Sequence, residues 1–495
     1  MNCIKNFEDF SIKNPEKKAL IWDNYSISYG ELNKLTNKFA NFLNSFASSK
    51  ERIAIFLPRS LEVYYSFIGT LKSGRIVTTL FQALNEKALE IRLKRGKIKT
   101  VITNSDLAKR INKKKISCLK NIIKVDSQKF KKNMDSASED FKLVQVKDNH
   151  TSIMLFTSST AGTPIAGIML PHISIKRQID TAKNILQLKP ERVYFCTADP
   201  GWITGAVYGI LAPLSIGATI VFAPERFSPD YWYSLIEKNK VEIIYTAPTA
   251  LRMLSSSNAH KKYDLSSLKY IFSVGEALNI PTYKWFKENL KIEVYDTYWQ
   301  TETGSIMIAN IPGKKIKPGS MGKPYKINAF VLDNKLKPSK TNEGMLAFKY
   351  PWNSMMTSIF QNPKMYRSYF KKGYFITNDL VKKDKEGYFF FLGRVDDIIK
   401  TSGERVSPIE VESVLMEFPN IKEVAVIGKP HPIYGEIIKA FIVLKKPKQK
   451  PEFEKIKKFM KSKLAAHAYP KEIEFIKKLP KTKSGKIIRK LLKEN

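Results

Sequence analysis

Residues 295–304, YDTYWQTETG, place a dense group of polar side chains directly after a strand-like segment. The preceding residues, KIEVYDTYW (291–299), predict a short buried strand, and Gly304 allows the backbone to turn sharply. Polar groups at the carboxyl end of a strand in an α/β sheet usually face a ligand crevice. The hydroxyl of Thr301 and the carboxylate of Glu302 suit a phosphate and its Mg²⁺, because hard oxygen ligands hold a hard cation. The stretch therefore predicts an α/β protein with a phosphate and magnesium site after this strand.

Strand-like runs alternate with helix-like runs before and after this segment. Short apolar runs such as RIAIFLP (52–58), EIIYTA (242–247) and KYIFSV (269–274) have the rhythm of parallel α/β layers. From about Lys314 the character changes to short strands and turns, and a smaller unit follows GRVDD (393–397). The predicted fold class is α/β: a large multi-layer N-terminal domain with parallel sheets and a small β-rich subdomain, plus a small mobile α+β C-terminal domain.

The net charge of +38 raises the question of a nucleic-acid or membrane partner. Only 14 of the 84 basic residues are arginine, which is the better bidentate ligand of phosphate and guanine, and the lysines run along the whole chain. Residues 203–223 carry no charge, but Pro213 and three glycines interrupt them, so a buried helix, a turn and a buried strand fit better than a membrane span. We therefore expect no specific nucleic-acid partner and no membrane anchor.

The cysteines and the first residues indicate a compartment. Cys3, Cys118 and Cys196 are far apart without a CxxC pair, and the five histidines show no metal-ligand spacing. Residues 1–10, MNCIKNFEDF, lack the apolar core of a secretory signal and the acid-free, arginine-rich composition of a transit peptide. A reduced, cytoplasmic setting without a zinc site is expected.

Eight segments of the chain contain the candidate functional residues. They are TSSTAG (157–162), ADPGWITG (198–205), YTAPTALRML (245–254), SVGEALN (273–279), YDTYWQTETG (295–304), ITND (376–379), GRVDDIIKTSGERVSPIEVES (393–413) and LPKTKSGKIIRKLL (479–492). These segments occur in the order and spacing of the AMP-forming acyl-CoA synthetases, and the chain resembles this adenylate-forming family over nearly its whole length. The closest resemblance is to acetyl-CoA synthetases in their shorter form. It implies an enzyme that activates a carboxylate with ATP, releases pyrophosphate, and passes the acyl group from its adenylate to CoA with release of AMP.

The resemblance assigns roles around the nucleotide. Thr301 matches a residue that contacts phosphate, and Glu302 matches the carboxylate that holds Mg²⁺. Asp379, assisted by Arg394, matches the group that grips the ribose hydroxyls, and Arg405 matches an arginine that faces the phosphates. The remaining predicted nucleotide-binding residues belong to the phosphate loop and the adenine pocket: Thr157, Ser158, Ser159, Thr160, Gly162, Gly275, Glu276, Ala277, Asp296, Thr297, Tyr298, Trp299 and Gln300.

Lys486 is the first candidate for catalysis, with Thr301 and Glu302. It matches the lysine that bridges the substrate carboxylate and the α-phosphate, and Ser484 and Gly485 before it predict a flexible turn. The resemblance also implies that acetylation of Lys486 would switch the enzyme off by removing its charge.

Two further residues match positions used in domain movement. The resemblance implies an AMP-binding domain over residues 1–393, a hinge at 394–397 with Asp396 as its central residue, and a mobile C-terminal domain over 398–495. Gly403 matches the loop that approaches the CoA tunnel, where a residue without a side chain lets the backbone come close to the thiol arm.

The acyl pocket predicts the substrate. Trp299 matches the indole that closes the pocket floor in acetyl-CoA synthetases, and Ile203, Thr204 and Val274 match its walls. An indole removes the volume that several methylenes would need, and overpacking is costly. Acetate is the predicted acid. Propionate or another short acid is the alternative, because one methylene is worth only about 1–3 kcal/mol of discrimination.

The phosphate loop departs from the family pattern T-S-G-[ST]-T-G-x-P-K-G. Residues 157–167 read TSSTAGTPIAG, so Ser159 replaces a glycine, the lysine is absent, and one extra residue precedes Gly167. Glycines there let backbone N–H groups wrap the phosphates, and the lysine adds charge. Two smaller departures are Ala277 for proline and Asn378 for glycine; asparagine tolerates positive φ, so the second is mild.

Two alternatives to the ligase stay open, one from these departures and one from the net charge. One is a degenerate relative that binds nucleotide with weak or no turnover; the retained residues Glu302, Asp379, Arg394 and Lys486 argue against it. The other is a polyanion-binding protein that reuses the fold, motivated only by the charge.

Overall fold

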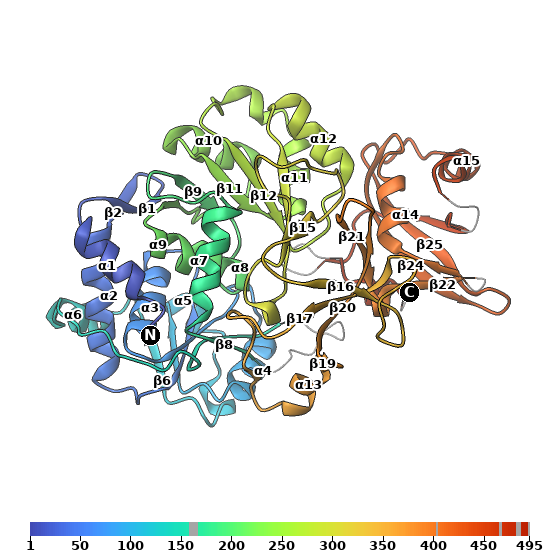
Figure 1. The fold of residues 1–495 in the computed structure, drawn as a ribbon. Coiled ribbons are helices and arrows are strands. Elements are labelled where there is room, and N and C mark those ends of the chain that lie inside the picture. The colour runs from blue at the N-terminus through green and yellow to red at the C-terminus, as the bar shows by residue number, and fades with distance from the viewer. Residues whose placement is uncertain (158–166, 402–403, 465–467, 482–486, 494–495) are drawn as a thin grey trace. The chain divides into compact units, whose positions relative to one another are not determined.

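The structure is a computed structural model that describes residues 1–157, 167–401, 404–464, 468–481 and 487–493 of the 495-residue chain (Figure 1). The chain forms two compact units. The first unit comprises residues 1–274, 292–314 and 351–368, and the second comprises 275–291, 315–350 and 369–495.

One sheet of the first unit has a parallel centre with an antiparallel strand at each end. The strands that belong to the first unit are, in spatial order, β14 (Ile308–Ala309), β13 (Val294–Tyr298), β12 (Tyr270–Val274), β11 (Ile243–Thr246), β9 (Val193–Cys196), β10 (Thr219–Val221), β1 (Lys18–Trp22) and β2 (Tyr25–Ser28). The strands β9 to β13 are almost entirely buried, which explains why they read as continuous apolar runs in the sequence.

The second sheet of the first unit is parallel from β7 to β6, and β8 and β18 extend it in the antiparallel sense. Its spatial order is β18 (Ser358–Ile359), β8 (Ile168–Pro171), β7 (Thr151–Leu155), β4 (Ile76–Thr79), β3 (Arg52–Phe56), β5 (Thr100–Thr103) and β6 (Asn121–Lys124). β7 leads directly into the phosphate-loop motif, so this sheet positions the start of that motif.

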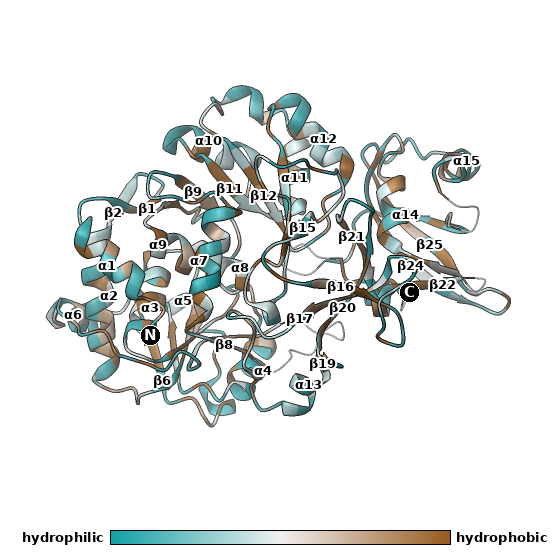
Figure 2. Cartoon of the chain, in the orientation of Figure 1, coloured by the Kyte–Doolittle hydropathy of each residue, from teal (hydrophilic) through white to brown (hydrophobic). Residues whose placement is uncertain are grey.

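Helices connect these strands, some buried and others with a polar outer face. Figure 2 shows the contrast between apolar strands such as β11 and β12 and the hydrophilic surface of α7. The helices of the first unit are α1 (Lys5–Lys13), α2 (Tyr29–Asn44), α3 (Leu61–Lys72), α4 (Glu86–Arg95), α5 (Ser105–Ala108), α6 (Gln128–Ser136), α7 (Ser174–Asn184), α8 (Ile203–Ala206), α9 (Ala212–Ile216), α10 (Pro229–Asn239), α11 (Pro248–Ser255) and α13 (Pro363–Ser368).

The uncharged stretch 203–223 folds as a buried helix, a turn and a strand. α8 continues through a π-helical turn, Val207–Leu211, into α9, the chain turns at Gly217 with φ +94°, and β10 follows. Across the described residues, no helix has both the length and the apolar character needed to cross a membrane.

The second unit is β-rich. An antiparallel sheet contains β16 (Ala329–Leu332), β17 (Glu343–Lys349), β20 (Tyr374–Lys383) and β19 (Phe370–Lys371), with β21 (Phe389–Arg394) paired to β20. A further sheet contains β23 (Glu404–Val406), β22 (Ile399–Thr401), β25 (Gly435–Leu444) and β24 (Ile421–His431), with β26 (Glu472–Phe475) paired to β25. The other elements of this unit are α12 (Ile280–Asn289), β15 (Lys323–Pro324), α14 (Pro408–Leu415), α15 (Phe453–Lys463) and α16 (Arg489–Lys493).

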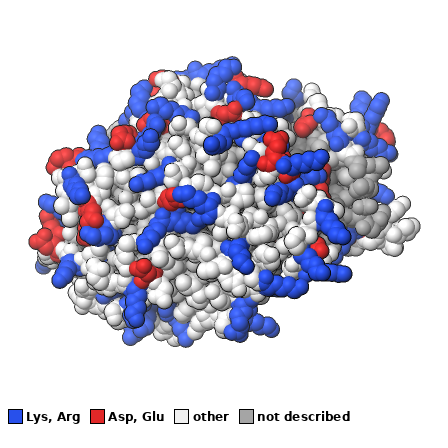
Figure 3. Space-filling model, in the orientation of Figure 1, with Lys and Arg blue, Asp and Glu red and all other residues white. Residues whose placement is uncertain are grey.

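The observed elements confirm the predicted fold class: parallel α/β layers come first, antiparallel β structure follows, and a small α+β part ends the chain. The predicted hinge at 394–397 stays a prediction. The basic side chains also follow expectation, because on the face shown in Figure 3 they are spread over the surface rather than gathered in one patch.

Candidate active site

The strand predicted over 291–299 is β13, Val294–Tyr298, and the polar residues Gln300–Thr303 follow its carboxyl end. Thr301–Thr303 form a short 3₁₀ turn that ends at Gly304, whose φ is +69°. A Cβ on Gly304 would lie 1.9 Å from the Ser354 carbonyl oxygen, so only glycine fits this turn. The turn holds Glu302 in a buried position with 8% of its surface exposed.

A segment from residues 351–358 fixes the Glu302 turn from outside. The Trp352 Nε1–H donates to the Thr303 carbonyl oxygen at 3.0 Å, and the Ser354 hydroxyl donates to the same oxygen at 2.7 Å. The Met356 N–H donates to the Glu302 carbonyl oxygen at 2.9 Å. These bonds satisfy the backbone of a sharp buried turn and hold the Glu302 backbone in one position.

The carboxylate of Asp296 is organised by the neighbouring strand. Asp296 and Thr297 are buried in β13, and the Ser273 hydroxyl of β12 donates to Asp296 Oδ1. The Thr297 N–H donates to the same oxygen at 3.1 Å. Of the other predicted adenine-pocket residues, Tyr298 ends β13 and Gln300 follows it in the first unit, while Gly275, Glu276 and Ala277 fall in the second unit.

The residues predicted to form the acyl pocket all lie in the first unit. Trp299 and Thr204 are each 8% exposed and Val274 is 7% exposed, while Ile203 is half-buried at the start of α8. Val274 of β12 pairs with Thr297 of β13, two residues before Trp299. The Trp299 ring meets the ring of Tyr208, one turn beyond α8, edge-on at 5.1 Å. Strand register therefore places Val274 beside the β13 end that leads to Trp299, and the ring contact brings the segment that follows α8 to the indole.

Two buried tyrosines around the indole received no role from the sequence. Tyr245 of β11 and Tyr208 are both fully buried. The Trp299 Nε1–H donates to the Tyr245 hydroxyl at 3.2 Å across 54 residues of sequence. Tyr245 lies within the YTAPTALRML motif, and the only local signal was an aromatic residue with a polar tip on a buried strand.

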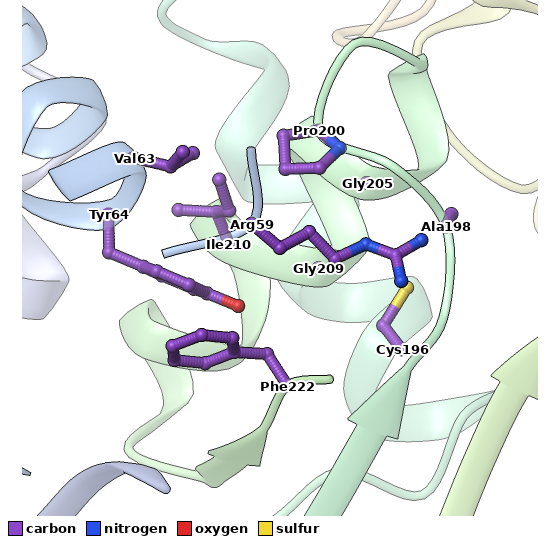
Figure 4. A pocket seen from close by; sticks show the side chains of 10 residues that line it. All are labelled: Arg59, Val63, Tyr64, Cys196, Ala198, Pro200, Gly205, Gly209, Ile210 and Phe222. Atoms are coloured by element: carbon purple, nitrogen blue, oxygen red, sulfur yellow. The ribbon is translucent and has the colours of Figure 1, made fainter. Parts of the chain in front are cut away.

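A small cavity lies behind the ADPGWITG loop, lined by residues that include Arg59, Cys196, Gly205 and Phe222 (Figure 4). It leaves ≈ 10 Å³ for the centre of a water-sized sphere, about the room that one water molecule needs. Arg59 donates to the Thr197 carbonyl oxygen, and its buried Nε finds no hydrogen-bond acceptor among the described residues. The cavity suits a water molecule and is too small for an acid substrate.

Asp199 anchors this loop. Its Oδ1 accepts the Gly201 N–H at 2.7 Å, and its carbonyl oxygen accepts the Trp202 N–H at 2.9 Å. A Cβ on Gly205 would lie 2.2 Å from the Asp199 carbonyl oxygen, so α8 packs directly on this turn. Burial raises the pKa of the Asp199 carboxyl from 3.8 to about 6, against the opposing effects of the Arg59 guanidinium and the Gly201 N–H.

This raised pKa predicts a pH dependence of stability. The folded chain holds the Asp199 proton more tightly than the unfolded chain does. Protonation of Asp199 therefore contributes fully to the free energy of unfolding below about pH 3.8, and this contribution is lost as the pH rises through 6. Relative to Asp199→Asn, the wild-type free energy of unfolding should fall by about 1 kcal/mol between pH 5 and pH 7. Urea denaturation of both proteins at several pH values measures this difference, and parallel profiles would contradict it.

In the second unit, Asp379 and Arg394 lie opposite each other on β20 and β21. Asp379 is 5% exposed, and Arg394 Nε lies 3.9 Å from its Oδ1, an ion-pair distance that is too long for a hydrogen bond. Asn378, which stands where the family has glycine, adopts φ +59°, as its tolerance of positive φ predicted.

The C-terminal part contains an ion pair that sequence analysis missed. Arg489 Nη2 donates to both carboxylate oxygens of Glu412 at 2.7 and 2.8 Å, and Glu412 Oε1 also accepts the Val426 N–H at 2.8 Å. Burial raises the pKa of Glu412. Burial opposes the charge of Arg489, yet the pKa of Arg489 is raised because the Glu412 charge, its hydrogen bonds and more distant carboxylates together favour the charged form. The pair fixes α16, three residues after Lys486, to α14 and β24.

Several predicted residues lie outside the described part of the chain: Ser158, Ser159, Thr160, Gly162, Gly403 and Lys486. The backbone of Asp396 belongs to the 3₁₀ turn Val395–Asp397 and that of Arg405 to β23, and their side chains lie outside the described part as well. Their assigned roles stay predictions.

The described donors fit a magnesium nucleotide. Glu302 supplies a buried carboxylate, and Thr157, which follows β7, has a buried hydroxyl without a hydrogen-bond partner among the described residues. Buried hydroxyls are normally satisfied, so this one suits a ligand oxygen. Mg²⁺ in nucleotide sites is commonly held by one or two carboxylates together with substrate phosphates.

Comparison with known proteins identifies the family of the chain. Residues 7–358 match the family model described as AMP-binding enzyme, and residues 410–486 match that described as AMP-binding enzyme C-terminal domain. An acetyl-coenzyme A synthetase of Bacillus subtilis (strain 168) is 44% identical over 94% of this chain and 84% of its own length. One from Methanothrix thermoacetophila is 34% identical over 96% of this chain and 78% of its own length.

Solved structures of CoA ligases share the fold of this chain. The crystal structure of the anthranilate CoA ligase AuaEII in complex with anthranoyl-AMP is 27% identical and has a TM-score of 0.93 over 100% of this chain and 97% of its own. A benzoate CoA ligase from Burkholderia xenovorans LB400 is 25% identical, with a TM-score of 0.90 over 100% of both chains. The chain belongs to the AMP-binding enzymes, among the AMP-forming acyl-CoA synthetases.

Proposed function

We propose that this enzyme is an acetate–CoA ligase that converts ATP, acetate and CoA into acetyl-CoA, AMP and pyrophosphate through an acetyl-adenylate. The observation that carries the proposal is the buried indole of Trp299, held by Tyr245 and bounded by Tyr208 at the predicted floor of the acyl pocket. A floor of this size excludes longer acids, because overpacking a buried site is costly. The relative at 44% identity, named acetyl-coenzyme A synthetase, favours turnover over a degenerate nucleotide-binding protein.

The roles proposed for the site residues are to bind and neutralise the negatively charged groups that react. Adenylation brings a carboxylate against a triphosphate, so it requires cationic neutralisation. Lys486 would bridge the carboxylate and the α-phosphate, Thr301 would bond phosphate, and Asp379 with Arg394 would hold the ribose. When bound, Mg²⁺ at Glu302 would neutralise phosphate charge.

Two further proposals rest on the family match, and a third rests on the cysteines. A hinge at 394–397 around Asp396 would let a domain at 398–495 move against residues 1–393 and alternate between Lys486 and the Gly403 loop that receives CoA. Acetylation of Lys486 would remove its charge and stop adenylation. The three free cysteines suit a reduced, cytoplasmic setting.

Pyrophosphate release with ATP, Mg²⁺, CoA and a panel of C2 to C8 acids tests the function. Release that requires acetate supports the ligase and shows that the altered phosphate loop is tolerated. Nucleotide binding without release for any acid would overturn the proposal in favour of a degenerate relative.

Removing the Glu302 charge should raise the Mg²⁺ requirement. Glu302→Gln keeps the size of the side chain but loses a hard anionic ligand, so half-maximal acetyl-adenylate formation should need about 10-fold more Mg²⁺. Mg²⁺ titrations of wild type and variant measure this shift. The matched control is Glu343→Gln, an exposed glutamate of β17 in the second unit. Superimposable titrations for wild type and Glu302→Gln would contradict the metal assignment.

A further inference from the structure

We propose that Tyr245 is a positioning residue that fixes the Trp299 indole and so sets the size of the acid that the enzyme accepts. This proposal rests on the proposed function, because it takes Trp299 as the floor of the acyl pocket. Tyr245 does not need to touch the acid; it acts through the indole.

A series of hydrogen bonds, in which each group donates to the next, runs from the predicted floor of the pocket to its predicted wall. The Thr297 hydroxyl donates to the Ser273 carbonyl oxygen at 2.8 Å, so its proton is committed and its oxygen accepts. The Tyr245 hydroxyl, 2.8 Å away, must therefore donate to Thr297 Oγ1. The Tyr245 oxygen is then free to accept the Trp299 Nε1–H at 3.2 Å. The order Trp299, Tyr245, Thr297, Ser273 ends one residue before Val274, a predicted pocket wall.

Burial makes this chain a strong constraint. Tyr245 and Ser273 are 0% exposed, Thr297 is 4% exposed and Trp299 is 8% exposed, so water does not replace a lost partner easily. Hydrogen bonds in series polarise one another and strengthen in a low-dielectric interior. An indole N–H left without its acceptor pays a desolvation penalty, which penalises any rotation of the ring away from Tyr245.

Tyr208 restrains the indole by a separate contact. Its ring meets Trp299 at 90° and 5.1 Å, and it also meets Tyr245 at 80° and 5.9 Å. Its hydroxyl accepts the Ile306 N–H at 3.0 Å and bonds the Thr181 hydroxyl at 2.7 Å, so this ring is itself fixed. The indole is therefore held by an edge-to-face contact with one tyrosine and by a hydrogen bond to the other. Of the two restraints, only the hydrogen bond can be removed by deleting a single atom.

A fixed indole at the pocket floor explains how the enzyme would distinguish acetate from propionate better than the shape of a yielding pocket would allow. A pocket separates homologous acids by one methylene only if its walls do not yield when the larger acid enters. Without the Tyr245 hydroxyl, the indole still lies at the pocket floor, but its ring can tilt. A tilted ring makes room in the pocket for one or two further carbons of the acid. The proposal therefore predicts altered selection between short acids with little effect on ATP.

The test is Tyr245→Phe, which deletes the hydroxyl alone. The ratio of kcat/KM for propionate to that for acetate should rise about 10-fold, with KM for ATP changed less than 2-fold. The matched control is Tyr29→Phe, which deletes another buried hydroxyl that donates to the Ala218 carbonyl oxygen at 2.8 Å. It should lose stability without changing the ratio.

A second readout does not depend on activity. In ¹⁵N-tryptophan-labelled protein, assigned with Trp299→Phe, the Trp299 indole N–H resonance should shift upfield in Tyr245→Phe and stay unchanged in Tyr29→Phe. An unshifted resonance would refute the hydrogen bond, and a shifted resonance with an unchanged acid ratio would refute the role in selection. A wild type that shows the bond but no acetate-dependent pyrophosphate release would overturn the proposed function and leave the positioning of Trp299 supported.

Discussion

Lys486→Ala is expected to abolish acetyl-adenylate formation and to leave thioester formation from supplied acetyl-adenylate nearly intact. In the first half-reaction the acetate carboxylate approaches the α-phosphate, and a compact ammonium between them offsets the repulsion. Removal of one such group typically costs about 100- to 1,000-fold in rate. In the second half-reaction the CoA thiol attacks a neutral carbonyl and AMP leaves, so the lysine is not needed at the same place.

Two assays on the same preparation separate these steps. Acetate-dependent exchange of pyrophosphate with ATP reports adenylation, and acetyl-CoA formation from synthetic acetyl-adenylate and CoA reports transfer. Lys478→Ala removes the same charge from an exposed lysine just before the LPKTKSGK motif and should leave both rates unchanged. Equal losses in both assays for Lys486→Ala would refute the role and point to a general effect on folding.

Sequence analysis predicted the features of the fold that are determined by residues close together in the sequence. The strand before Gly304 is visible because its residues are buried on both faces, and the sharp turn is visible because only glycine fits there. The positive φ of Asn378 agrees with its residue type, because asparagine tolerates positive φ. The fold class followed because the spacing of strands and helices is also a local property of the chain.

The contacts that fix the site were not predictable in this way, because their partners are distant in sequence. Trp352 holds the Glu302 turn across 49 residues, and Arg489 reaches Glu412 across 77. The bond between Trp299 and Tyr245 is of the same kind. A single sequence shows the residue types but not which of them meet, so the family resemblance could name Trp299 but not what positions it.

Trp299→Gly should shift the acid preference from acetate towards C4–C8 acids. The substitution removes a buried indole and leaves the Tyr208 ring and the Tyr245 hydroxyl around the space, so a longer chain can fill it. Each methylene that reaches this space gains about 1–3 kcal/mol, so two or three of them reverse the preference by about 100-fold or more, while acetate loses its packing.

The measurement for Trp299→Gly is kcat/KM for each straight-chain acid from C2 to C8. Trp232→Ala is its control, because it removes another buried indole, packed on Phe195 at 5.3 Å, and should destabilise the fold without changing the preferred acid. The comparison matters because loss of a large core side chain lowers every rate through unfolding, whereas only loss of the pocket floor changes their order. A folded Trp299→Gly that still prefers acetate would show that another residue sets the length of the pocket, and the Tyr245 proposal would fall with that assignment.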